Sequence, residues 1–156
     1  MTPALWEHRR RRALWLCLAV FVVRVFGQIE VLLLAPPWLP KFSAWESGLI
    51  PYAVLLPLQI LLIGWMAVIA SDHSRGSGPM WVESSLVRKR LKAFAVVYAS
   101  VMLLRLVVTA ALPPHTLIDR GLIPIVAHWD LAGFVALLAR TPMSSTKGGS
   151  PAVPPS

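Results

Sequence analysis

The sequence predicts an all-α, polytopic membrane protein, a four-transmembrane-helix bundle with both termini in the cytoplasm. Three observations lead to this prediction. Of the 156 residues, 56% are hydrophobic, and they are collected into four long runs, as membrane spans require. Basic residues gather beside alternate ends of these runs. The seven Trp residues lie mostly near run ends, which is typical of an interfacial aromatic belt.

The orientation is predicted from the distribution of Lys and Arg. Of the 15 basic residues, eleven lie outside the runs on the side of the N-terminus, and two, Lys41 and Arg120, lie on the opposite side. An excess of this kind marks the cytoplasmic face, so we expect a multi-pass protein of a bacterial inner (cytoplasmic) membrane with N-in and C-in topology. Eight of the eleven are expected to contact lipid headgroups or to set topology: Arg9, Arg10, Arg11, Arg12, Arg88, Lys89, Arg90 and Lys92.

The first span, residues 14–34, follows a basic cytoplasmic segment, residues 1–13. Arg24 lies near the centre of this span, and Gln28 and Glu30 follow it. An Arg at the bilayer midplane costs about 3 kcal/mol, and a carboxylate costs a similar amount. The apolar residues of the span return only about 6 kcal/mol, so the helix is marginal alone. We therefore expect it to need polar partners on other helices.

The connection after the first span contains three Pro residues and is expected to be largely non-helical. Its aromatic residues, Trp38, Phe42 and Trp45, are expected in the headgroup region.

The second span, residues 49–70, contains Pro57, which is expected to kink the helix. Gln59 lies two residues later and is expected to satisfy the backbone carbonyl that this Pro frees.

The second half of the chain follows the same alternation of spans and connections. Residues 71–79 are polar and are expected to form a loop, and residues 80–92 are expected to form an amphipathic helix on the cytoplasmic membrane surface. The third span covers residues 93–112 and the fourth covers residues 121–139, with a short connection that predicts an antiparallel hairpin. The Ser-, Pro- and Gly-rich tail, residues 141–156, is expected to be disordered. The transmembrane domain as a whole covers residues 14–140.

Polar residues from all four spans fall at a similar depth. Unpaired groups of this kind are expensive in lipid, so we expect them to face one another as a buried polar network or a ligand site. The candidate residues are Arg24, Gln28, Glu30, Gln59, Arg105, His128 and Asp130.

The helical period indicates which of these groups share a direction. His128 and Asp130 are about 200° apart on their helix and are expected to point to different neighbours. We expect a buried salt bridge between Arg105 and Asp130. Arg24 would then pair with Gln28, Gln59, Glu30 or His128.

Several chemistries are disfavoured by what the sequence contains. One cysteine, Cys17, excludes an intrachain disulfide and a cysteine zinc site, and His128 has no second histidine at its depth for bis-His haem ligation. We therefore expect no metal site and no cofactor. Nucleotide-binding and hydrolase motifs are absent, which favours a protein that is not an enzyme. The formal charge of +8 does not predict nucleic-acid binding, because the basic residues flank the spans.

Three functions remain open. The first is an accessory or structural subunit of a larger membrane complex, since the chain is small and has no sizeable domain outside the spans. The second is a small oligomeric transporter or channel for an anion or a proton, with the polar layer as its site. The third is an intramembrane protein that binds a quinone, a haem or a lipid. The expected partners are the lipid bilayer, other membrane subunits or further copies of the chain.

Overall fold

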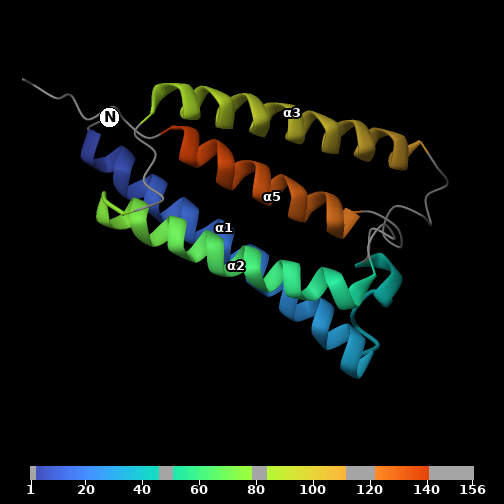
Figure 1. The fold of residues 1–156 in the computed structure, drawn as a ribbon. Helices are drawn as coiled ribbons and strands as arrows, with labels where there is room; N and C mark the ends of the chain where they lie inside the picture. The colour runs from blue at the N-terminus through green and yellow to red at the C-terminus, as the bar shows by residue number, and fades with distance from the viewer. Residues whose placement is uncertain (1–2, 46–50, 79–83, 112–121, 141–156) are drawn as a thin grey trace, which may run out of the picture.

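The structure is all-helical, as the sequence predicts. This computed structural model describes residues 3–45, 51–78, 84–111 and 122–140 (Figure 1). Four of its helices are long and apolar enough to cross a membrane. The elements are α1 (Pro3–Leu34), the short 3-10 helix η1 (Phe42–Ala44), α2 (Tyr52–Arg75), α3 (Ser85–Ala110) and α5 (Leu122–Ala139).

The four long helices form a bundle with one open side. Among the described residues, the long helices contact one another in the order α2, α1, α5, α3, and α1 and α5 also contact η1. Within the described residues, no Cα atom of α2 lies within 8 Å of a Cα atom of α3 or α5. Figure 1 shows α5 between α3 on one side and the α1–α2 pair on the other. The side between α2 and α3 is therefore open.

The helices run up and down, so their ends alternate. The starts of α1 and α3 and the ends of α2 and α5 lie at one end of the molecule, on the left of Figure 1. We name this the basic end. It holds the Arg and Lys side chains within 9–12 and 88–92, together with Arg75 and Arg140.

The hydrophobic core is centred on α1. Eight buried residues form its largest cluster: Leu14, Leu18, Phe21 and Val25 of α1, Met66 and Ala70 of α2, and Phe134 and Leu138 of α5. In α3 the one buried residue is Ala95. Most of the α3 surface is consequently exposed in the described structure.

The first helix begins earlier than the predicted span. α1 starts at Pro3, so the basic segment is continuous with the first span. Pro is well tolerated in a first turn, and the residues that follow are mostly strong helix formers. Glu7 and Arg11, one turn apart, form a salt bridge of 3.8 Å on the exposed side.

Within the described residues, the predicted surface segment before the third span is not a separate helix. α3 begins at Ser85, whose preceding residue Ser84 caps the helix by accepting a hydrogen bond of 3.5 Å from the Val87 backbone N–H. Residues 85–92 are thus the first two turns of the third spanning helix. The start of the predicted segment, residues 80–83, lies outside the described residues. The same holds for the connection between the third and fourth spans, residues 113–120, and for the tail, residues 141–156.

The polar residues after Ala70 are helical, which corrects the expectation of a loop there. α2 continues to Arg75 and ends at Gly76, whose φ of 74° suits a left-handed C-cap. Ser74 donates a hydrogen bond of 2.7 Å to the Ala70 carbonyl and accepts one of 3.1 Å from the indole of Trp15 on α1. Packing against α1 therefore overrides the polar composition of this turn.

The connection after α1 folds back onto the helix. Trp45 is 8% exposed and lies against Gly27. A β-carbon at Gly27 would lie only 2.8 Å from the Trp45 ring, so only glycine fits this approach. The Trp45 indole donates a hydrogen bond of 3.2 Å to the Pro40 carbonyl. Trp38, in contrast, is 76% exposed.

Candidate functional site

The fourth helix separates two of the candidate residues. The hydroxyl of Tyr98 on α3 is hydrogen-bonded to Nδ1 of His128, and the two rings meet edge to face with centroids 5.7 Å apart. Asp130 instead lies beside Cys17 of α1. His128 and Asp130 therefore point to different neighbours, as their spacing predicts.

A polar cavity lies where the four helices face one another. Its volume is about 370 Å³, and every long helix contributes to its lining. Five polar or charged residues line it: Arg24 of α1, Gln59 of α2, Tyr98 and Arg105 of α3, and His128 of α5. The remaining lining residues are apolar and lie mainly on α2 and α5. Four of the seven candidate residues, Arg24, Gln59, Arg105 and His128, thus line one cavity.

Gln28 and Gln59 form a buried amide pair between α1 and α2. The Gln59 amide donates a hydrogen bond of 3.2 Å to the Gln28 side-chain oxygen. Gln28 is fully buried and Gln59 is 6% exposed. Gln59 was expected to serve the backbone near Pro57, but α2 passes through Pro57 as one helix and the amide turns to α1.

Two arginines, Arg24 and Arg105, line the cavity, and Arg24 is only partly satisfied. A terminal nitrogen of Arg24 donates a hydrogen bond of 3.1 Å to the Trp45 carbonyl, and Arg24 Nε is buried with no hydrogen-bond partner among the described residues. Arg105 lines the same cavity and is half-buried. Both guanidinium groups lie close enough to His128 to act on it electrostatically. None of the described residues that line the cavity is acidic.

The expected salt bridge between Arg105 and Asp130 is not found. In the described parts of the chain the one salt bridge joins Glu7 to Arg11. Arg105 faces the polar cavity, whereas Asp130 is on the side of α5 that faces α1. Oδ2 of Asp130 is buried without a hydrogen-bond partner. The spacing that separates His128 from Asp130 thus also separates Asp130 from α3.

Glu30 lies away from the polar cavity. It is exposed, and with Arg24 and Asp130 it lines a second cavity of about 690 Å³ between α1 and α5. The rest of that cavity is apolar. Arg24 is the one charged residue that both cavities share.

The sequence reasoning missed a buried polar group at the basic end. Arg10 is 2% exposed, Asp72 is 7% exposed and His73 is fully buried. Arg10 was expected at lipid headgroups, and the other two were expected in a solvated loop. His73 Nδ1 is hydrogen-bonded to the Ile69 carbonyl at 3.0 Å, and both Arg10 and Asp72 act on it electrostatically. The other basic candidates at this end are exposed or half-buried.

The described residues contain no cluster of three or more His, Cys, Asp or Glu side chains that could hold a metal ion. The polar cavity instead combines two cationic side chains with one imidazole, one phenol and one amide. Groups of these types bind anions and hydrogen-bond acceptors. No protein-family model, curated protein or solved structure matches this chain.

Proposed function

We propose that this chain is an integral membrane protein that binds a small anionic ligand in the polar cavity. The observation that carries the proposal is that Arg24 and Arg105, on different helices, line one cavity that has no acidic lining residue. Such a site extends the predicted anion site of a small transporter or channel, and binding is the activity that it supports most directly.

The physical argument starts from the cost of an uncompensated cation. An arginine near the centre of a bilayer costs about 3 kcal/mol, and a buried donor without an acceptor costs a further 1–3 kcal/mol or so. Arg24 Nε is such a donor. A carboxylate in the cavity supplies acceptors to both guanidinium groups, which bind carboxylates through two parallel hydrogen bonds.

His128 and Gln59 add specificity to this site. The hydrogen bond between the Tyr98 hydroxyl and His128 engages Nδ1, so Nε2 is the ring nitrogen that remains for a ligand. The Gln59 side-chain oxygen is buried and lacks a hydrogen-bond partner in the described structure. Because Gln59 lines the cavity, a rotation of its amide would offer this oxygen to a ligand hydroxyl or amide.

The apolar part of the lining points to an amphiphilic ligand. Leu55 and Leu58 of α2 and Met102 of α3 line the cavity beside the open side of the bundle. A ligand can therefore reach the site from the bilayer, with its apolar body between α2 and α3 and its carboxylate at the arginines. The volume of about 370 Å³ is within the usual range of small-molecule sites.

The test compares a carboxylate with its neutral amide. Octanoate and octanamide are titrated by calorimetry against the protein in phosphatidylcholine nanodiscs, with empty nanodiscs to subtract partitioning. We expect octanoate to bind and Arg105→Gln to weaken it about 10- to 100-fold, the usual worth of a charged hydrogen bond. Arg90→Gln removes the same charge from the exposed start of α3 and should have no effect. Equal binding of octanamide, or equal effects of the two variants, would refute the proposal.

A second candidate function is that of an accessory subunit. The open side between α2 and α3, and the exposed carboxylate of Glu30, favour it, because a partner helix with a polar residue could cover either. Extraction from its native membrane in a mild detergent should then give a complex heavier than the 17.2 kDa chain. Recovery of the single chain, with the same thermal unfolding midpoint as before extraction, would contradict the accessory-subunit function.

We also infer that the basic end faces the cytoplasm, in an inner membrane. The support is the clustering of basic residues at one end of the helices. Reporter domains fused to either terminus should both be inaccessible to proteases added outside intact cells. Cleavage of either reporter would contradict this orientation.

A further inference from the structure

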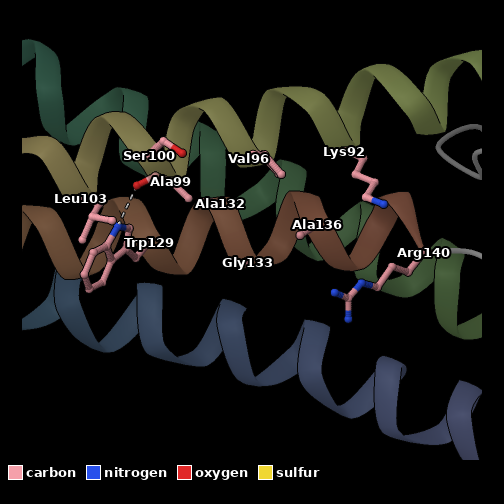
Figure 2. A pocket seen from close by; sticks show the side chains of 11 residues that line it. Lys92, Val96, Ala99, Ser100, Leu103, Trp129, Ala132, Gly133, Ala136 and Arg140 are labelled. Atoms are coloured by element: carbon pink, nitrogen blue, oxygen red, sulfur yellow. Dashed lines mark hydrogen bonds between the residues drawn. The ribbon is translucent and has the colours of Figure 1, made fainter.

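A groove on the lipid-facing side of α3 and α5 is separate from the two cavities described above. Its volume is about 480 Å³ (Figure 2). Five small residues line it: Ala95 and Ala99 of α3, and Ala132, Gly133 and Ala136 of α5. Lys92 and Arg140 lie together at one end of the groove, and Trp129 lies toward the other end. We propose that this groove is a binding site for one anionic phospholipid.

The small residues explain why an acyl chain would fit. Ala and Gly side chains leave room above the contact between α3 and α5, and a β-carbon added at Gly133 would meet no atom within 4 Å. The Trp129 indole donates a hydrogen bond of 3.3 Å to the Ala99 carbonyl, which holds its ring across the groove. The groove therefore has an apolar floor, with Trp129 fixed at the end away from Lys92 and Arg140.

The length of the groove matches one leaflet. Along α3 it extends from Lys92 to Leu103, which is about 16 Å at the helical rise per residue. The hydrocarbon core of a bilayer is about 30 Å thick, so the groove covers roughly half of it. A lipid whose headgroup lies at the basic end would thus have its chain along the groove.

The charges at the end of the groove select the headgroup. Lys92 and Arg140 lie at the basic end, and no acidic residue is found among the described residues that line the groove. Two cations beside an apolar channel complement a phosphate with a net negative charge. The same charges disfavour a second copy of the chain as the occupant of the groove. Copies in one bilayer share an orientation, so a two-fold contact through this groove would bring four cations together.

The test measures lipid selectivity. The purified protein is titrated in detergent with phosphatidylglycerol or phosphatidylcholine, and bound lipid is counted by native mass spectrometry. We expect one phosphatidylglycerol to bind with clear preference. The double variant Lys92→Gln, Arg140→Gln should weaken it about thirtyfold, the attraction usually found for two basic residues near an anionic surface. The control Lys89→Gln, Arg90→Gln removes the same charge from exposed residues outside the groove and should change little.

A third variant tests the groove itself. Gly133→Leu places a side chain in open space, so the fold should be kept, but the groove is filled. It should abolish selective binding while leaving the circular dichroism spectrum unchanged. Equal loss in the charge control, or equal binding of the two lipids, would overturn the proposal. So would a dimer that Gly133→Leu dissociates, because a second copy would then occupy the groove.

Discussion

The buried amide pair between α1 and α2 allows a quantitative test of the polar contacts. Gln28 and Gln59 share one hydrogen bond of 3.2 Å, and both are almost completely buried. Hydrogen bonds between membrane helices contribute about 0.6 kcal/mol on average and up to about 1.7 kcal/mol. Truncating one partner also leaves the other amide unpaired, at about 1–3 kcal/mol. We therefore expect Gln28→Leu and Gln59→Leu each to lower the free energy of unfolding by about 1–2 kcal/mol.

The double variant is the informative one. When both amides are replaced by leucine, no polar group of the pair is left without a partner, and two apolar side chains of similar size meet. The double variant should consequently cost about 1 kcal/mol less than the sum of the single variants. The free energy of unfolding can be measured by SDS titration in mixed micelles, followed by circular dichroism.

A matched cycle provides the control for this measurement. Thr109 on α3 bonds the Arg105 carbonyl of its own helix, and α3 does not pack on α1 in the described structure. Gln28→Leu combined with Thr109→Val should therefore be additive within about 0.5 kcal/mol. If the Gln28 and Gln59 variants are equally additive, the amide bond does not stabilise the α1–α2 contact and the reasoning fails.

Three further predictions concern single side chains. Gly27→Ala should lower the unfolding free energy by about 1–3 kcal/mol, because its methyl group would displace the Trp45 ring; an unchanged SDS midpoint would contradict this. Gly64→Ala meets no atom within 4 Å and should be neutral or stabilising by up to about 1 kcal/mol in the same assay. Tyr98→Phe should cost about 1 kcal/mol through loss of the His128 hydrogen bond, and it should shift the imidazole NMR signals of His128; unchanged signals would show that the bond is not formed.

Much of the site could be predicted from depth and helical phase. The positions of Arg24, Gln59, Arg105 and His128 in their spans predicted that they would meet, and all four line one cavity. The neighbour of each helix could not be predicted, because hydrophobic runs of similar length give no order in the membrane plane. The Arg105–Asp130 pairing failed for this reason, since Asp130 turned to α1.

The boundaries of the helices depended on contacts that composition does not reveal. Polar residues after Ala70 resembled a loop, yet Ser74 extends α2 by bonding both its own helix and Trp15. The inward turn of Trp45 likewise depends on the missing side chain at Gly27. The sequence alone does not show whether a glycine in an apolar run permits a close contact, as Gly27 does, or lies in open space, as Gly64 does.

The order of the helices in space has a consequence for biosynthesis. α3 leaves the ribosome before α5, but its described helix contacts are with α5 alone. When α3 has just left the ribosome, Arg105 therefore lies on a helix whose packing partner, α5, has not yet been synthesised. We therefore expect this helix to stay unpacked until α5 has been synthesised, so that packing is completed from the last segment inward rather than in the order of synthesis.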